Sequence, residues 1–191
     1  AQLIDSKTGE VYKSFQLDGT AEKILPTIDS LSAMVRNFLV LSKLEKEISP
    51  AYSLTAWTTF PEAFRYFIYG VNAFNKREYP TARNMFLQAI GIDSTYYLAA
   101  FHISLSYGSQ GLYDEAKKWC LTIYRKRDHM TVNQKISTNW LYAACFEKSK
   151  YNEIKYLKQL LVIDDQSPGR LWSLGRAYGE LYQYENAIPL L

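Results

Sequence analysis

Two histidines and two cysteines are the side chains in this sequence best suited to metal binding or nucleophilic chemistry. His102 and His129 lie far apart along the chain, and neither stands at a metal-ligand spacing. Cys120 and Cys145 are also well separated and fall in apolar helical patterns, where a thiol is commonly a small buried hydrophobe. We therefore predict no metal site, and we interpret His102, in AAFHISLSY, as a partly buried helix residue rather than a base or ligand.

Acidic pairs are the next candidates for chemistry. Asp164-Asp165, or Glu45 with Glu47, could supply a general acid and a general base. Asp164-Asp165 stands where we expect a turn, however, and carboxylates are common in turns. The sequence also contains no Gly-Lys-Ser/Thr phosphate loop and no Gly-x-Ser-x-Gly elbow. We predict that the chain is not an enzyme and binds no cofactor.

Basic residues gather in one stretch, which holds Lys117, Lys118, Arg125, Lys126 and Arg127. A nucleic-acid-binding face is usually strongly basic, whereas the net charge of this chain is only +3. Cations near the C-terminus of a helix gain about 0.3–1 kcal/mol from the exposed carbonyl groups, so a solvated helix end accounts for the cluster. We predict no nucleic-acid partner.

The composition sets the class of protein. Hydrophobic residues at 48% and charged residues at 21% are close to the average for soluble domains, and no run of about 18 apolar residues indicates a membrane segment. The sixteen tyrosines suit large seams between helices or a recognition surface. Thiols in apolar patterns permit reducing surroundings, which favours a cytoplasmic location. The opening AQLIDSKTGE has neither Met nor a signal-peptide pattern, so we expect a piece of a longer protein.

Residues 1–42 form the first predicted unit. Apolar and polar residues alternate on either side of the turn SKTG, a pattern typical of a β-hairpin. Apolar residues then recur every three or four positions and form one helical stripe: Ile24, Ile28, Leu31, Val35 and Phe38. Pro26 fits this helix if the helix starts just before it, whereas a start at Ala21 would produce a kink. Residues 43–58 lose the period, and we interpret them as a linker.

Helix signals follow in series from residue 59. Thr59 with Glu62 and Thr131 with Gln134 have capping-box spacing, and Ser167 precedes a proline suited to the first helical position. Two residues stand where left-handed conformations often close helices: Asn75 and Gly111. We expect pairs of helices of about 12–14 residues joined by short turns.

The segment EYPTARNMFLQAIGID, residues 78–93, returns about 34 residues later as LYDEAKKWCLTIYRKR, a period typical of stacked helical repeats. The shift places Ala82 over Ala116 and Phe86 over Cys120. Small residues at Gly70, Ala82 and Ala89 suit a close crossing of two helices, so they specify the fold and not a chemistry.

These residues resemble tetratricopeptide repeats, whose Trp-Leu-Gly-Tyr-Ala-Phe-Ala-Pro pattern spans about 34 residues. The matching positions are Gly70, Ala82, Phe86 and Ala89 in the first repeat, and Leu174, Gly175, Tyr178, Tyr184 and Ala187 in the last. The resemblance implies an all-α superhelix of antiparallel helix pairs, about 3.5 repeats long. It would occupy residues 59–191, with repeats near 63–96, 97–130, 131–167 and 168–191. The third repeat is degenerate, and its Tyr151 comes later than the spacing from Tyr113 requires.

Residues 1–42 resemble the last hairpin and helix of the TolB amino-terminal-like domain, a small α/β unit that precedes tetratricopeptide arrays in bacterial regulators. The turn residues Asp5, Thr8 and Gly9 and the helix segment Asp29-Ser30-Leu31 carry the match. The resemblance implies that this unit is a fragment of an α/β domain. It also implies that the intact protein is a bacterial signalling or transcriptional regulator with its output domain elsewhere.

In the tetratricopeptide family, the first helix of each pair lines a concave face that binds partner segments. The resemblance assigns nine residues to that face: Phe64, Phe67, Val71, Phe74, Leu98, Phe101, Leu105, Trp172 and Arg176. An apolar lining favours a helical peptide and lacks the cations of the family's carboxylate clamp. Alternatively, the stripe of residues 24–38 covers the first repeat, which makes Phe64 and Phe67 ordinary core. Trp172 and Arg176 lie too far along the array for residues 24–38 to cover them. Tryptophan and arginine are also frequent in binding hot spots.

The predicted function is a non-enzymatic protein–protein interaction scaffold that binds a peptide or partner segment on its concave face. A pre-formed curved array would bind by surface complementarity. The alternative is a structural self-association module or spacer, because the last helix leaves an apolar seam that could pair two copies.

Overall fold

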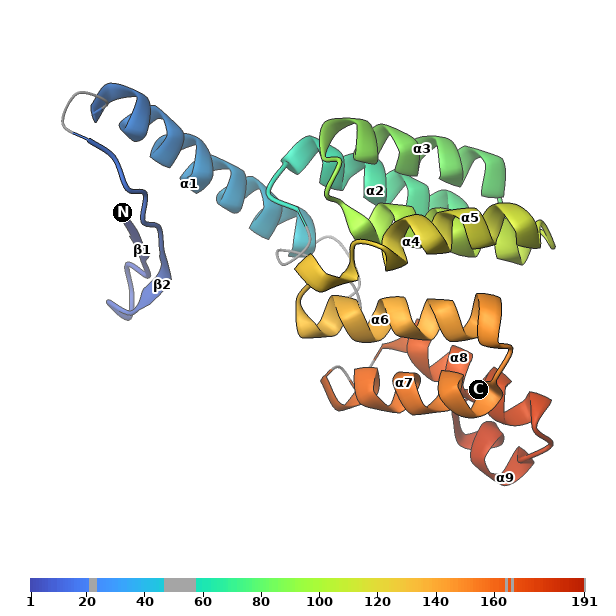
Figure 1. The fold of residues 1–191 in the computed structure, drawn as a ribbon. Helices are drawn as coiled ribbons and strands as arrows, with labels where there is room; N and C mark the ends of the chain where they lie inside the picture. The colour runs from blue at the N-terminus through green and yellow to red at the C-terminus, as the bar shows by residue number, and fades with distance from the viewer. Residues whose placement is uncertain (21–23, 47–57, 164, 166, 191) are drawn as a thin grey trace.

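The computed structural model describes residues 1–20, 24–46, 58–163, 165 and 167–190, and it is mostly helical (Figure 1). A two-stranded hairpin and one long helix come first: β1 (Gln2–Ile4), β2 (Val11–Ser14) and α1 (Ile24–Lys46). Helices then follow in succession: α2 (Pro61–Asn75), α3 (Tyr79–Ile92), α4 (Tyr97–Ser109), α5 (Tyr113–Tyr124), α6 (Val132–Tyr142), α7 (Lys150–Ile163), α8 (Pro168–Glu180) and α9 (Tyr184–Ala187). Shorter turns complete the chain: the 3₁₀ turns η3 (Arg127–His129) and η5 (Ile188–Leu190), and the π-helical turn η4 (Ala143–Glu147).

The predicted hairpin is confirmed. Strands β1 and β2 pair antiparallel, with Gln2 opposite Ser14 and Leu3 opposite Lys13. Asp5 shapes the turn, because its Oδ1 accepts hydrogen bonds from the backbone N–H groups of Lys7 at 2.7 Å and of Thr8 at 3.0 Å. These two bonds lower the pKa of the Asp5 carboxyl, since they favour its charged form.

Helix α1 confirms the expectation for Pro26, because it begins at Ile24 and places the proline in its first turn. The hairpin packs on the helix through Phe38, whose ring centroid lies 5.5 Å from that of Phe15 and 6.0 Å from that of Tyr12. The helix continues to Lys46, past the predicted boundary at residue 42. Most of the predicted linker, residues 47–57, lies outside the described residues.

The apolar stripe of α1 does not cover the helix array. Ile24 and Ile28 are more than half exposed, and Leu41, beyond the predicted stripe, is the α1 residue that joins the core of α2 and α3. By length and composition alone, Ile24–Lys43 is also apolar enough to cross a membrane. Core helices of soluble proteins and signal sequences pass the same test, so this is weak evidence for a span.

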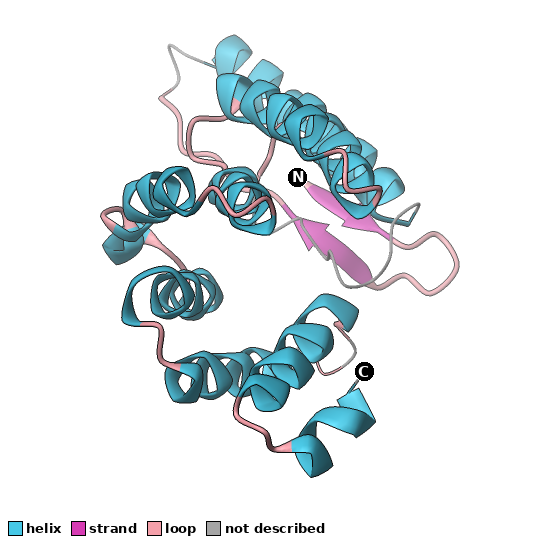
Figure 2. Cartoon of the chain, turned by 90° about the vertical axis from the view of Figure 1, so that its right-hand side faces the viewer, coloured by secondary structure: helices cyan, strands magenta, loops and turns pink. Residues whose placement is uncertain are grey.

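Left-handed residues mark the turns inside successive helix pairs, at Arg77, Gly111, Lys148 and Tyr182. The first and last steps between these positions are equal, at about 34 residues, which is the period that the sequence predicts. At the first, second and fourth turns, the residue after the left-handed one donates its backbone N–H to the carbonyl five residues earlier, which closes the preceding helix. The three bonds run from Glu78 N to Ala73 O, from Leu112 N to Tyr107 O and from Gln183 N to Tyr178 O. The backbone therefore repeats together with the sequence. Figure 2 shows the helices stacked along a curve.

Two expectations about the turns are corrected by these positions. Asn75 lies inside α2, and the left-handed residue is Arg77, two positions later. Helix α7 begins at Lys150, which makes Lys150 and not Tyr151 the counterpart of Tyr113 at the start of α5. The step from Gly111 to Lys148 is longer than the other two, and the π-helical turn η4 lies within it.

Two of the predicted N-cap positions are confirmed and one is wrong. Thr131 and Gln134 form a complete capping box at α6, and Ser167 is the N-cap residue of α8, although its side chain makes no capping bond. Helix α2 has Phe60 as its N-cap residue, so the predicted box at Thr59 is wrong. The neighbouring Thr58 is buried instead, and its hydroxyl donates to Asp93 Oδ2 at 2.6 Å, which ties the start of α2 to the end of α3.

Two clusters of buried residues make up the core of the array. The first joins α2, α3 and α4 with Leu41 of α1, and the second joins Ala100 of α4 to α5 and the later helices. Ile90, Phe101 and Trp119 pack against both clusters and form the seam between them. A cavity of about 70 Å³ lies at this seam, lined in part by Ile90, Tyr96, Trp119 and Lys126. It is far smaller than the roughly 300 Å³ of a typical small-molecule site.

Candidate interaction surface

Four of the nine predicted groove residues are buried in the core. Phe64, Phe67, Val71 and Leu98 are at most 9% exposed, so they offer no accessible surface. Phe67 contacts Phe86 of α3 and Tyr96 at the start of α4, with ring centroids 5.6 and 5.3 Å apart. The alternative prediction, in which Phe64 and Phe67 are ordinary core residues, is correct about their burial. The cover comes from α3, α4 and Leu41, however, and not from residues 24–38.

Three more predicted groove residues are half-buried between helices. The ring of Phe74 meets Tyr79 of α3 at 5.4 Å, and the ring of Phe101 meets Trp140 of α6 at 5.8 Å. Leu105 packs against the second core cluster. These side chains therefore hold neighbouring helices together, and only part of each remains open to a partner.

His102 lies among aromatic rings in the first core. Its ring centroid is 5.1 Å from that of Phe67, 5.4 Å from that of Phe86 and 5.6 Å from that of Phe101. Burial disfavours the charged imidazolium and lowers the pKa of His102 from 6.5 to about 4, against the opposing hydrogen bond to the Leu98 carbonyl. The side chain is 8% exposed, so it is more deeply buried than the sequence indicated. Within the described ranges, no three His, Cys, Asp or Glu side chains gather as metal ligands.

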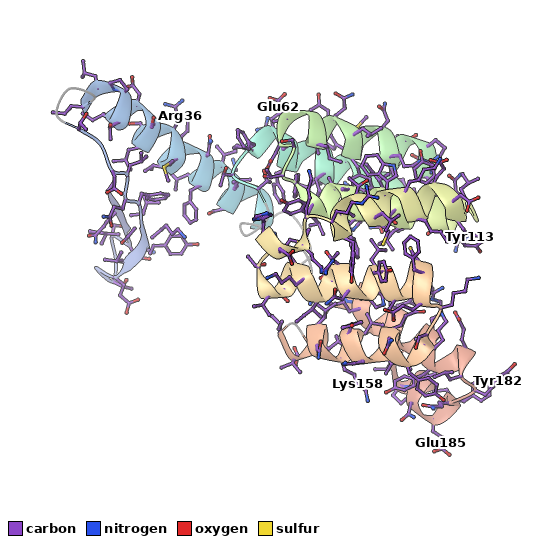
Figure 3. The ribbon with its side chains drawn as sticks, viewed as in Figure 1. Arg36, Glu62, Tyr113, Lys158, Tyr182 and Glu185 are labelled. Atoms are coloured by element: carbon purple, nitrogen blue, oxygen red, sulfur yellow. The ribbon has the colours of Figure 1, made fainter. Side chains whose placement is uncertain are left out.

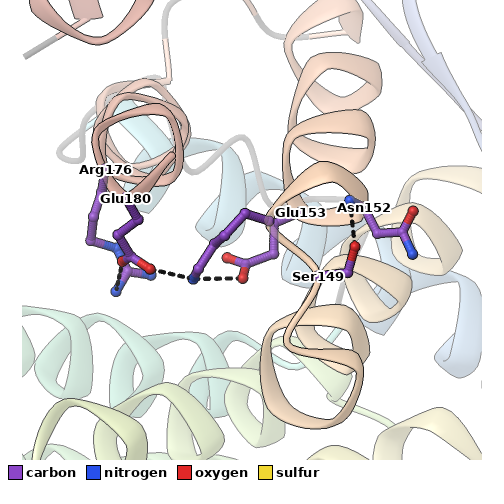
Figure 4. Close-up of polar contacts among 6 residues, drawn as sticks. Ser149, Asn152, Glu153, Arg176 and Glu180 are labelled. Atoms are coloured by element: carbon purple, nitrogen blue, oxygen red, sulfur yellow. Dashed lines mark hydrogen bonds and ion pairs between the residues drawn. The ribbon is translucent and has the colours of Figure 1, made fainter. Parts of the chain in front are cut away.

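The last two predicted residues, Trp172 and Arg176, lie at the surface of α8. Trp172 is 57% exposed, and the Arg176 guanidinium carbon lies 5.5 Å from the centroid of its ring. Arg176 Nη1 also lies 3.6 Å from Glu180 Oε1, one turn further along (Figure 4). The two contacts limit where the guanidinium can go, and the exposed indole therefore has a defined neighbour.

Lys150 links these α8 side chains to the preceding helix, α7. Its Nζ lies 2.7 Å from Glu153 Oε1 on α7 and 2.8 Å from Glu180 Oε2 on α8. Burial alone would lower the pKa of Lys150, but the bonds to Glu153 and Glu180 outweigh it and raise that pKa. Glu153 is 1% exposed, so its carboxylate depends on this partner. We call Lys150, Trp172, Arg176 and Glu180 the α7–α8 surface.

The local sequence positions Lys150 at the start of its helix. Ser149 precedes α7, and its Oγ accepts a hydrogen bond from the backbone N–H of Asn152 at 3.3 Å (Figure 4). The left-handed Lys148 turns the chain into this start. Sequence reasoning missed Lys150 and Glu153, although their i,i+3 spacing is a recognisable pairing signal.

Further exposed aromatic side chains lie at the same end of the array. Tyr182 is 80% exposed and Tyr184 is 56% exposed, and their rings meet edge to face at 6.2 Å. Figure 3 shows Tyr182 and Glu185 pointing away from the helix stack. Tyr184 was predicted only as a repeat position, and Tyr182 was not predicted, because the exposure of a single tyrosine has no distinctive sequence signal.

The basic cluster is partly engaged within the chain. The Arg127 guanidinium lies 4.0 Å from the ring centroid of Tyr124 and donates to the Tyr124 carbonyl at 3.3 Å. Lys118 Nζ pairs with Glu115 at 2.6 Å. Arg125 is the C-cap residue of α5, as a solvated helix end requires. The absence of a nucleic-acid partner remains a prediction.

The geometry thus gives a curved stack of helix pairs with a row of aromatic and charged side chains at one end. Its resemblance to tetratricopeptide repeats, and that of residues 1–42 to the TolB amino-terminal-like domain, remain predictions. No protein-family model matches the sequence, and no curated protein matches it.

Proposed function

We propose that the chain is a non-enzymatic protein-interaction scaffold that binds a partner segment on the α7–α8 surface. The observation that carries the proposal is Trp172, a large aromatic side chain that is 57% exposed beside an arginine and is not needed to fill the core. Trp and Arg contribute disproportionately to binding hot spots. The partner would place an apolar group on the indole and polar groups near Arg176 and Glu180.

The helix pairs are tetratricopeptide repeats in this proposal. Its support is the regular spacing of the left-handed turn residues, at or near the period of that family, together with the small residues where α2 and α3 cross. A stack of this kind holds its surface in place before binding, so little ordering entropy is lost when a partner docks. The resemblance of residues 1–42 further suggests a role within a bacterial signalling or transcriptional regulator.

The proposed surface lies on α8 and α7, and the lining predicted on α2 is not part of it. Phe64, Phe67 and Val71 would have to leave the core before a partner could reach them. Truncating such buried side chains would damage the fold and reveal nothing about binding. Trp172 and Arg176 can be changed without that complication.

Affinity capture tests the proposal. The whole chain and its Trp172→Ala/Arg176→Ala variant serve as baits in a lysate of the source organism at moderate salt. Tyr113→Ala/Lys118→Ala is the matched control, because it removes an exposed aromatic ring and an exposed cation from α5. Thermal melting by circular dichroism establishes that all three are folded.

We expect a protein that the wild type and the control retain and that the Trp172→Ala/Arg176→Ala variant loses. A direct titration of that protein, once purified, should show the same order of affinities. Equal recovery by all three baits would exclude the α7–α8 surface as the binding site.

Self-association is the second candidate, favoured by apolar side chains that the described residues leave uncovered. Ile24, Leu25 and Ile28 of α1 and Val162 of α7 are each more than half exposed. Ile24, Leu25 and Ile28 lie within about one turn of α1, and exposed apolar side chains that lie together can mark interaction sites. Light scattering across a wide concentration range tests this candidate by measuring the molar mass. A constant monomer mass would exclude a self-association module.

A further inference from the structure

The two cysteines, distant in sequence, meet in the folded chain. Cys120 lies on α5 and is fully buried, whereas Cys145 lies in the π-helical turn η4 and is partly buried. Cys120 belongs to the second core cluster and Cys145 packs against that cluster, and η4 packs directly on α5. Each thiol shifts the pKa of the other, so the two side chains are neighbours. The pair is therefore a contact between two helix pairs of the array.

The surroundings of the two sulfur atoms differ. The neighbouring Cys145 thiol and then burial raise the pKa of the Cys120 thiol. The Cys120 thiol lowers the pKa of Cys145, and the nearby cation of Lys117 acts in the same direction, while burial and the Glu153 carboxylate oppose the shift. The Ser104 hydroxyl, which donates its hydrogen to the Ala116 carbonyl at 2.7 Å, also lowers the pKa of Cys145.

The backbone around Cys145 is unusual. Turn η4 is π-helical, and the left-handed Lys148 follows it directly. Single π-helical turns occur frequently at functional sites. Here the turn carries a partly buried thiol and packs on the helix that carries a fully buried one, so an oxidant reaches Cys145 first and Cys120 is the resolving group.

We propose that Cys120 and Cys145 are a redox-active dithiol that a hydroperoxide converts into an intramolecular disulfide between α5 and η4. The Cys145 thiolate attacks the terminal peroxide oxygen, the O–O bond breaks, and the alcohol or water leaves with the proton of the thiol. The product is a sulfenic acid at Cys145. The Cys120 sulfur then attacks the Cys145 sulfur, the S–O bond breaks, and the hydroxyl leaves as water with the Cys120 proton. Two thiols lose two electrons in total, and the peroxide gains them.

The new bond would tie the second helix pair to the third. It would fix η4, which leads into α7, and α7 carries Glu153 and Lys150 of the ion network beside α8. This inference does not rest on the proposed function, because it concerns the core and not the α7–α8 surface.

The test treats the whole, folded chain with hydrogen peroxide, denatures it in a maleimide that blocks remaining thiols, and measures the intact mass and the peptide map. We expect the loss of both free thiols, a mass lower by two hydrogen atoms, and a peptide that joins Cys120 to Cys145. Dithiothreitol should restore both thiols. In Cys120→Ser, the sulfenic acid at Cys145 should persist and react with dimedone.

Three results would overturn the proposal. The first is an over-oxidised Cys145 beside a free Cys120, and the second is a disulfide-linked dimer on a non-reducing gel. The third is formation of the bond no faster in the folded chain than in the same chain unfolded in guanidinium, because native geometry would then not direct it. This last comparison uses the wild-type chain alone, so it holds even if a cysteine variant folds poorly.

Discussion

Gly70 of α2 lies directly against the ring of Phe86 on α3. A Cβ atom added at Gly70 would come within 2.6 Å of Phe86 Cδ1, closer than side-chain carbons approach in proteins. Phe86 is completely buried and cannot move aside. The absence of a side chain at Gly70 therefore sets the distance between the first two helices of the array.

We predict that Gly70→Ala lowers the free energy of unfolding by about 1–3 kcal/mol, because it overpacks this crossing. Gly91→Ala is the matched control, since a Cβ there meets nothing within 4 Å. The control should be neutral or slightly stabilising, as alanine is the better helix former. Urea unfolding of both variants measures the difference, and equal stabilities would contradict the close approach.

Protonation of His102 should weaken the fold in mild acid. Its pKa is about 4 in the folded chain and 6.5 when this core does not enclose it, so the unfolded state binds the proton more readily. The contribution of His102 to the free energy of unfolding is fully present above pH 6.5. It decreases as the pH drops toward 4, by about 3 kcal/mol in total. Urea unfolding at intervals between pH 7 and pH 4 follows the loss.

The variant His102→Leu isolates that contribution, because it removes the titrating group and keeps an apolar side chain among Phe67, Phe86 and Phe101. Its stability should depend less steeply on pH across the same window than that of the wild type. His129→Gln, at an exposed position, is the matched control for removal of an imidazole. Identical slopes for the wild type and His102→Leu would show that His102 does not carry the effect.

Lys150→Met should destabilise the chain by leaving the buried Glu153 carboxylate without its cation. The expected loss is about 2 to 4 kcal/mol, somewhat below that for a wholly buried pair because Lys150 is one quarter exposed. Lys118→Met breaks a pair of the same spacing and similar length at the surface, and it should change stability little. Chemical unfolding compares the two, and similar losses would contradict the role assigned to burial.

Tyr142 should hold a ladder of stacked rings together. Its ring centroid lies 4.1 Å from that of Tyr124 and 4.9 Å from that of Phe146, with interplanar angles of 20° and 23°. Tyr142→Leu loses both contacts and should cost about 1–3 kcal/mol, while Tyr142→Phe keeps the stack and should cost little. Near-ultraviolet circular dichroism, recorded with the unfolding curves, should change for the leucine variant alone.

Local features of the fold were predictable because short-range chemistry decides them. The turn around Asp5 and Gly9, the first-turn position of Pro26 and the capping box at Thr131 depend on neighbouring residues only. The period of the repeat also survives in the backbone, because each pair must present the same faces to the next.

Long-range contacts decided the features that sequence reasoning missed. An apolar period shows that Phe64 is buried but not which helix covers it, and the cover is α3 and α4 rather than residues 24–38. Thr59 had capping spacing, yet its neighbour Thr58 bonds to Asp93, at the far end of the next helix. Cys120 and Cys145 were correctly expected in apolar helical surroundings, but their contact depends on η4, which no short pattern indicates.

The division of the core into two clusters has a mechanical consequence. The seam between them depends on three half-buried residues, Ile90, Phe101 and Trp119, and a cavity lies beside it. A force that pulls the ends of the array apart would pass through this seam, where the cavity leaves some side chains without packing partners on one side. The array should therefore behave as two blocks joined at this seam, and a change in its curvature would be concentrated there.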